Sequence, residues 1–570
     1  MATAKRLYLY VVSAAGLAMA LSGAAVMLRT LVNNLGVGPQ ATAAKLTSSS
    51  DREALSLGLG LVVAGLAVWL VHWALVERMV QGQEDAPTAE RRSIVRSLFF
   101  VAVLATTLSI AAAMWIQLVS KIVADRLEAP KTAASMVLVS VTDDAWLLAV
   151  AVVATAAFAY HAWIRDRDLR QTALIARAAA WTSRFYLYGA AFVGLIAALD
   201  EISSIIRTIG AEWASVGVHG PGAVWVRPVV IALVGMVVWG AVWLAHWWYS
   251  NRMRAAQNAQ AEAERTSRVR LAFLAGVVLW GVSVVTMNVA SGLGQLFAWA
   301  INVKTSLPTW YLILVPPFAA IPAAVAWWWH RQVALAEEPA GPAGVSATRI
   351  TIYVTALVGL ASLSVGAAQV LQALIVQMFG QSRQVGPDAW KLPVALGIAS
   401  VVVGVAIWIL PWMAAQARVL SQRTTETVSS ARSYYLYLVL GASVVIGAAG
   451  LAMVVYRYCR LFIGLKEPGL AGEVAGQIAA LVVTGVLLAY HARVMRDDMT
   501  PHDMVVYVAP VAPVPPAPPP AATSAEAAPS SRARSRAKAE PAAKAAPAAK
   551  AAPAAKAAPA AKAKAAPKRP

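Results

Sequence analysis

The sequence has one cysteine, Cys459, in 570 residues. A single cysteine cannot form an intramolecular disulfide, and it cannot build the multi-cysteine sites that hold structural zinc or an iron-sulfur cluster. Charged residues are also scarce, at 13%, whereas 59% of the residues are hydrophobic. These shortages exclude a disulfide-stapled secreted fold, and they are not typical of a water-soluble protein.

Long apolar stretches fill most of the chain. Stretches of about 20 residues, enough to cross a hydrocarbon core of roughly 30 Å, recur from Leu7 to Leu488, and we count twelve of them. They lack the alternating pattern of outer-membrane barrel strands, and a lone strand cannot satisfy its backbone in lipid. The sequence therefore predicts an all-α, polytopic membrane protein, with about twelve transmembrane helices arranged as six tandem hairpins.

The start of the first helix of each hairpin repeats along the chain. The first apolar segment opens with Arg6-Leu7-Tyr8-Leu9-Tyr10, and the later openings are residues 184–188, 349–353 and 433–437, with weaker copies from residues 96 and 270. Because internal copies cannot be signal peptides, we expect the segment at Leu7 to be a retained transmembrane helix.

The end of the second helix of each hairpin also repeats. An aromatic residue and a histidine recur at one repeat position in five hairpins, and these histidines are His72, His161, His246, His330 and His491. The fifth hairpin has Pro411 there instead.

With its Arg-x-Tyr-Leu-Tyr opening, a span, a polar turn and a second span, the repeat resembles an uncharacterised bacterial integral-membrane family known only as a domain of unknown function. That family is a module of four helices, and the resemblance implies about three copies between residues 5 and 497. It implies no activity. We expect membrane modules at residues 1–170, 171–340 and 341–500, followed by a separate segment, 501–570.

The repeated histidines allow two interpretations. If the hairpins formed a ring, His72, His161, His246, His330 and His491 would be weak candidates for haem or metal ligands, since imidazole is a common ligand. The simpler interpretation places them beside Trp and Tyr in the aromatic belt at the membrane surface, which needs no convergence of side chains. We favour the belt and expect no metal and no cofactor.

Charged residues inside an apolar span are functional candidates by default. Asp200 and Glu201 lie in the first helix of the third hairpin, with Arg207 two turns further on and Arg29 at the equivalent position of the first hairpin. A structural ion pair is the expected role, and a proton or cation path is the alternative.

The segment 501–570 differs from the rest of the chain. Between Ser531 and Pro570 there are eleven Lys or Arg residues and one acid, and a hexapeptide repeat places Lys544, Lys550, Lys556 and Lys562 six residues apart. Frequent proline and a lack of large apolar side chains predict a disordered basic tail. We expect these lysines to contact anionic lipid headgroups, with non-specific nucleic acid binding or a plain spacer as alternatives.

The distribution of Lys and Arg predicts the orientation of the helices in the membrane. Lys and Arg are more frequent between hairpins than within them, which places both termini in the cytoplasm of a bacterial cell with the helices in its inner membrane. The sequence has no nucleotide-binding or metalloprotease motif, and no small-molecule substrate can be identified. We expect a non-enzymatic membrane module that acts as a tether or scaffold; the alternatives are a transporter or channel, and a haem- or metal-binding membrane redox protein.

Overall fold

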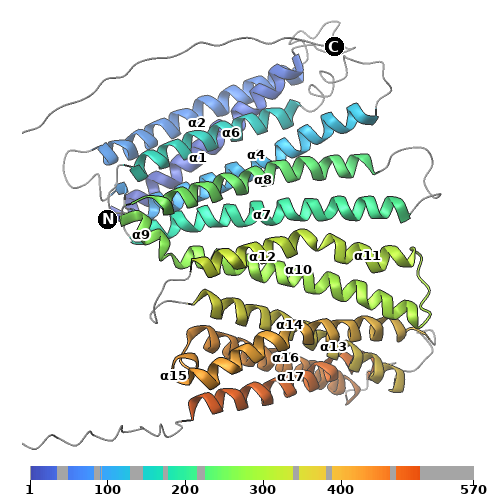
Figure 1. The fold of residues 1–570 in the computed structure, drawn as a ribbon. Coiled ribbons are helices and arrows are strands. Elements are labelled where there is room, and N and C mark those ends of the chain that lie inside the picture. The colour runs from blue at the N-terminus through green and yellow to red at the C-terminus, as the bar shows by residue number, and fades with distance from the viewer. Residues whose placement is uncertain are drawn as a thin grey trace, which may run out of the picture. The chain divides into compact units, whose positions relative to one another are not determined.

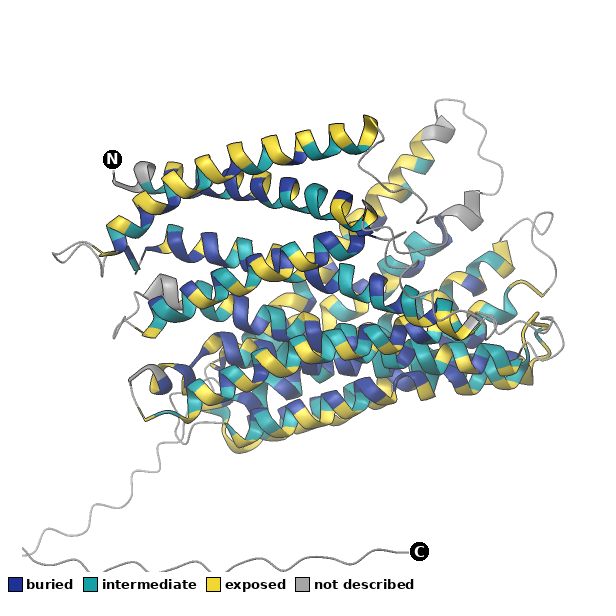
Figure 2. Cartoon of the chain, turned by 90° about the horizontal axis from the view of Figure 1, so that it is seen from above, coloured by how far each residue is buried: buried dark blue, intermediate teal, exposed yellow. Residues whose placement is uncertain are grey.

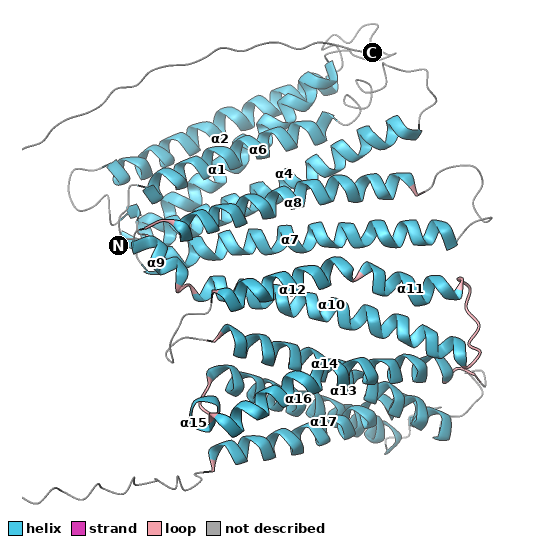
Figure 3. Cartoon of the chain, in the orientation of Figure 1, coloured by secondary structure: helices cyan, strands magenta, loops and turns pink. Residues whose placement is uncertain are grey.

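The computed structural model describes residues 2–34, 49–81, 90–91, 93–128, 145–170, 177–214, 225–257, 259–337, 346–379, 388–462 and 470–500. These residues are helical apart from short turns and connections, with no strand among them (Figure 3). Residues Met1–Pro501 form one compact unit. The lysine-rich segment 531–570 lies outside the described residues.

Two helical hairpins make up each module, and the two hairpins of a module lie side by side in Figure 1. The helices of the first module are α1 (Ala2–Asn34), α2 (Ser49–Gln81), α4 (Ile94–Glu128) and α6 (Ala145–Arg170). Those of the second are α7 (Arg177–Ala214), α8 (Val226–Ala255), α9 (Ala259–Arg265), α10 (Arg268–Ala300), α11 (Thr309–Ala319) and α12 (Ile321–Ala336). Those of the third are α13 (Ala347–Phe379), α14 (Lys391–Ser421), α15 (Arg423–Glu426), α16 (Ser430–Phe462) and α17 (Leu470–Met499).

Twelve spans in the described residues are long and apolar enough to cross a membrane, which confirms the predicted number. The eighth span, Thr309–Ala336, consists of two helices, α11 and α12. Pro316 and Pro317 lie inside α11, and Pro322 is the second residue of α12, so the break at Ala320 lies between prolines, which cannot donate a backbone hydrogen bond.

The helix surfaces fit a lipid environment. Many large apolar side chains are exposed, including Leu57, Val63 and Leu70 on α2. In water such exposure would be costly, whereas in a bilayer these side chains contact acyl chains. Figure 2 shows exposed residues along the helices, with buried residues where a helix meets its neighbours.

Glycine allows the two helices of a hairpin to approach closely. A Cβ added at Gly65 on α2 would lie 2.4 Å from the backbone nitrogen of Ala20 on α1. A Cβ added at the equivalent Gly404 on α14 would lie 2.3 Å from the backbone nitrogen of Leu363 on α13. The first hairpins of modules 1 and 3 therefore pack backbone against backbone, as small residues permit in membranes.

Each module has its own hydrophobic core near one end of its helices. Tyr10, Trp73 and Phe99 belong to the core of module 1. The other two cores contain the equivalent residues, Tyr188, Trp247 and Phe273 in module 2 and Tyr353, Trp412 and Tyr435 in module 3. The repeat seen in the sequence is thus also a repeat of packing.

Candidate functional site: three buried arginine clusters

In each module, a buried glutamate accepts hydrogen bonds from two side chains of the first helix. In module 2, Arg184 Nε lies 2.6 Å from Glu264 Oε2, and the Tyr188 hydroxyl, one turn along α7, donates to Oε1 of the same glutamate. The equivalent groups are Arg6, Tyr10 and Glu90 in module 1 and Arg349, Tyr353 and Glu426 in module 3. The three glutamates are at most 2% exposed, so their charges depend on these partners.

A second arginine lies at the centre of each group. In module 2, Arg270 Nε and Nη2 each lie 2.7 Å from one carboxylate oxygen of Glu337. Its Nη1 donates to the hydroxyls of Tyr188 at 3.2 Å and Ser250 at 3.1 Å, and Nη2 also donates to Asn251 at 2.9 Å. All five N–H donors of this guanidinium are therefore used inside the protein.

The same arrangement recurs around Arg96 and Arg432. Arg96 donates to Tyr10 at 3.1 Å, to Asp168 at 2.8 Å and to Glu77 at 2.9 Å. The partners of Arg432 are Tyr353 at 3.3 Å, Asp498 at 2.6 and 3.0 Å, and Gln416 at 3.3 Å. We call each group an arginine cluster. Each cluster joins the four membrane spans of its module, since its members lie in all four or directly beside them; in module 2 the last member, Glu337, directly follows α12.

A local signal fixes the position of the central arginine. The Ser267 side chain accepts a hydrogen bond from the backbone N–H of Arg270, as an N-cap residue does at the start of a helix. Ser429 does the same for Arg432 in module 3. The serine thus starts the helix and places the arginine in its first turn, where the guanidinium reaches the tyrosine of the first helix.

Aromatic rings line the clusters on one side. The Arg270 guanidinium carbon lies 4.6 Å from the ring centroid of Trp247, and Arg96 and Arg432 lie 5.6 Å from Trp73 and Trp412. These distances are within the range of cation–π attraction. A central arginine therefore has carboxylates and hydroxyls at its edge and an indole against its face.

The clusters were missed by the sequence analysis, although the sequence contains a signal for them. The pattern Glu-x-x-Ser-x-x-Arg occurs at residues 90–96, 264–270 and 426–432, between the two hairpins of each module. A carboxylate also follows the second-hairpin histidine by seven residues, at Asp168, Glu337 and Asp498. The predicted orientation uses only the Lys and Arg residues of these connections and does not pair them with the carboxylates.

The five histidines do not form one ring; they separate into two kinds. His72 and His246 belong to first hairpins, and each Nε2 lies 3.3 Å from a tyrosine hydroxyl, of Tyr8 and Tyr186 respectively. His161, His330 and His491 belong to second hairpins and are at most 1% exposed. Aromatic rings of the modules enclose them, so these three lie inside the protein and not in a lipid-facing belt.

In the described part of the chain, no group of three or more His, Cys, Asp or Glu side chains could hold a metal.

The intramembrane charges occupy two different environments. Asp200 and Arg207 form an exposed ion pair, with 3.3 Å between Oδ1 and Nη2. Glu201 faces α8, where a Cβ added at Gly235 would lie 2.6 Å from its Oε1. The residues equivalent to Glu201 in the other modules are Gly23 and Gly366, so a carboxylate replaces a glycine of the helix interface in module 2. Arg29 is exposed on α1.

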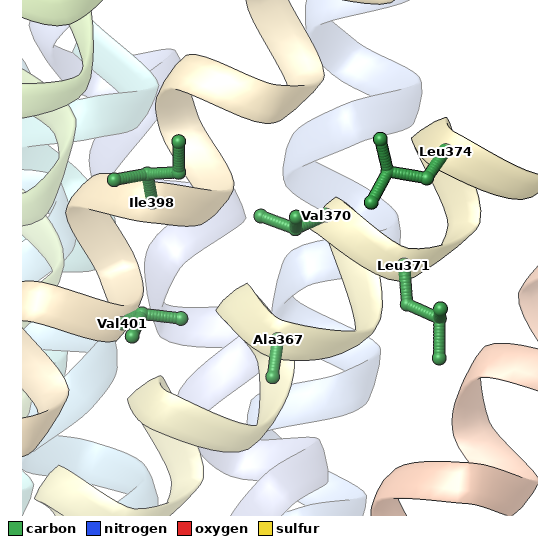
Figure 4. Close-up of a pocket in the computed structure, with 6 residues that line it drawn as sticks. All are labelled: Ala367, Val370, Leu371, Leu374, Ile398 and Val401. Atoms are coloured by element: carbon green, nitrogen blue, oxygen red, sulfur yellow. The ribbon is translucent and has the colours of Figure 1, made fainter. Parts of the chain in front are cut away.

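The described residues also line an apolar pocket between α13 and α14 (Figure 4). Its volume is about 380 Å³, and its lining consists of Ala367, Val370, Leu371, Leu374, Ile398 and Val401. Asp200 and Glu201, the intramembrane carboxylates that a proton or cation path would use, are not part of this lining.

The fold and the clusters define a class of protein: a multi-pass, all-helical membrane protein made of three tandem four-helix modules, each closed at one end by buried charges. The chain belongs to the family described as a domain of unknown function, DUF5671, whose model matches residues 6–143, 184–326 and 349–486. This confirms the expected family and its three copies. Searches of curated proteins and of solved structures found no match.

If the cluster stabilises the module, replacing Arg270 or Arg268, both on α10, should change the free energy of unfolding by very different amounts. Arg270→Ala empties the buried centre of the cluster and leaves the partly buried carboxylate of Glu337 with Arg254 as its remaining arginine partner, and we expect a loss of about 3–5 kcal/mol in the free energy of unfolding. Arg268→Ala is the matched control, because Arg268 is exposed two residues earlier; its effect should stay within about 0.5 kcal/mol. Thermal unfolding in detergent measures both, and equal effects would contradict a structural cluster.

Proposed function

We propose that this chain is a non-enzymatic scaffold or tether of the bacterial inner membrane, with both termini in the cytoplasm. In this proposal the three modules hold the protein in the bilayer, and the basic segment after α17 binds surfaces of negative charge. The arginine clusters serve as structural ties, because all five N–H donors of Arg270 bond groups of the protein itself.

One observation carries the proposal: the last helix of the membrane unit ends in an arginine cluster, just before the segment 501–570 of the sequence. Asp498, in the last turn of α17, bonds Arg432, and Arg423 donates to the backbone oxygen of Asp497 at 2.7 Å. The end of α17 is thus held in the cluster three residues before Pro501.

Exposed arginines at the cluster end support the cytoplasmic orientation. Arg170 is exposed at the end of α6, and Arg265 at the end of α9. Positive charges near the ends of spans are retained on the cytoplasmic side. That side also carries anionic lipid, the nearest partner for lysines tethered at the membrane.

If the basic segment is a tether, the membrane-embedded protein should bind separate anionic vesicles in a salt-sensitive way. The full chain, reconstituted in neutral nanodiscs, should bind anionic vesicles at 0.1 M salt and release them at 1 M, since the Debye length falls from about 10 Å to about 3 Å. Neutral vesicles should not bind. Replacing Lys544, Lys550, Lys556 and Lys562 by Gln should weaken binding by roughly fivefold for each lysine, at about 1 kcal/mol per charge.

A chain ending at Pro501 is the control for this experiment. It should keep the thermal unfolding midpoint of the full chain and lose vesicle binding. Equal binding to neutral vesicles would contradict the proposal, and so would salt-resistant binding to one nucleic acid sequence.

Transport is the second candidate, and Glu201 is the observation that favours it. This carboxylate lies between α7 and α8 at a position where the other modules have glycine, so it is a feature of one module and not of the shared scaffold. In that case proteoliposomes would carry a proton or cation flux that Glu201→Gly abolishes. Asp200→Asn is the control, because Asp200 is exposed and pairs with Arg207; its flux should survive. The absence of flux in the unmodified protein would eliminate this candidate.

A further inference from the structure

The three modules differ at one buried hydroxyl. In module 3, the Tyr435 hydroxyl lies 3.3 Å from Trp408 Nε1 and 3.4 Å from His491 Nε2. His491 Nδ1 lies 2.9 Å from the carbonyl oxygen of Leu487, which assigns the ring proton to Nδ1 and leaves Nε2 as an acceptor. The hydroxyl therefore accepts a hydrogen bond from the indole and donates one to the imidazole.

Modules 1 and 2 keep this tryptophan and histidine but have no hydroxyl. The residues equivalent to Tyr435 are Phe99 and Phe273, three positions after the central arginine of each cluster. The rings occupy the same places: the centroid distance to the histidine is 6.0 Å for Phe99, 5.8 Å for Phe273 and 5.8 Å for Tyr435. Only the oxygen of the tyrosine is missing.

Four buried nitrogen atoms consequently have no hydrogen-bond partner among the described residues. They are Trp69 Nε1 and His161 Nε2 in module 1, and Trp243 Nε1 and His330 Nε2 in module 2. In both modules the histidine Nδ1 lies 2.8 Å from a carbonyl oxygen, so Nε2 is again an acceptor. Each module thus has one unpaired donor and one unpaired acceptor, which a single oxygen atom bonds in module 3.

We propose that modules 1 and 2 each bind one buried water molecule between this tryptophan and this histidine, in the role of the Tyr435 hydroxyl. Water accepts from the indole N–H and donates to the imidazole, whereas leaving both groups unpaired is unfavourable. A metal ion suits the site less well, because the indole is a donor with no lone pair to offer. The two bonds of Tyr435 are long, so an oxygen free of the ring can approach the nitrogens more closely.

The direct test is ¹⁵N NMR of the full chain with labelled histidine. The Nε2 signals of His161 and His330 should match that of His491, as hydrogen-bond acceptors, and should show magnetisation transfer from water that His491 lacks. Signals typical of an unbonded imidazole nitrogen, or no transfer from water at either histidine, would overturn the proposal.

Exchanging the hydroxyl between modules gives the second test. Phe99→Tyr should displace the water, removing the transfer at His161 while His330 keeps its own, with no loss in the unfolding midpoint. Tyr435→Phe should create a third water site, seen as new transfer at His491. Phe100→Tyr is the matched control, because it adds the same hydroxyl to an adjacent buried ring that is Leu436 in module 3; it should lower the midpoint and keep the transfer at His161. If Phe99→Tyr lowers the midpoint as much as Phe100→Tyr, the site has no place for an oxygen and the proposal fails.

Discussion

The pairing of a buried guanidinium with carboxylates from other helices is the interaction on which the rest of each module depends. A charge removed from water must be paired and hydrogen bonded, and an arginine with five donors can satisfy that need only if several helices meet around it. In module 2 the donors of Arg270 reach α7, α8 and the residue directly after α12. The cluster therefore specifies which helices become neighbours, something that apolar packing alone leaves less defined.

Packing and charge act at different places along the helices. Within the span, Gly65 and Gly404 bring two backbones into contact, and no charge is needed there. At the end of the module, the hairpins are joined by side chains that cross from one to the other, such as Arg96 on α4 to Glu77 on α2. Close packing thus defines a hairpin, and the cluster joins two hairpins into a module.

The three modules share the main residues of the arginine cluster and differ at positions outside it. The glutamate, the serine and the central arginine are present in all three modules. Two other positions differ between the modules. Module 2 has the carboxylate of Glu201 where the others have a helix-interface glycine, and module 3 has the phenol of Tyr435 where module 1 has the phenyl ring of Phe99. Each variation changes a polar group in an apolar setting, where the presence or absence of a partner has a large effect.

The sequence predicted the twelve spans, the hairpins and the repeat, because apolar length and recurring Arg-x-Tyr openings depend on local composition. It did not predict the clusters, since Tyr10 and Glu90 are 80 residues apart and meet only after the hairpins pack. The environment of the histidines could not be predicted from the sequence for the same reason. Their neighbours in sequence suggested a membrane-surface belt, whereas the burial of His161 depends on rings from other helices, Trp73 and Phe99. The place of Glu201 opposite Gly235 likewise required the packing of α7 on α8.

A double-mutant cycle between Glu264 and Glu337 tests most directly whether a cluster acts as one unit. Tyr188 bonds to Glu264 and Arg270 bonds to both Tyr188 and Glu337, so the path between the two glutamates runs through Tyr188 and Arg270. Thermal unfolding of Glu264→Gln, Glu337→Gln and the double variant should give a coupling of at least about 0.5 kcal/mol, and Tyr188→Phe should reduce it. Losses that add within about 0.3 kcal/mol would show instead that the two ion pairs are independent and that the cluster does not tie the module together.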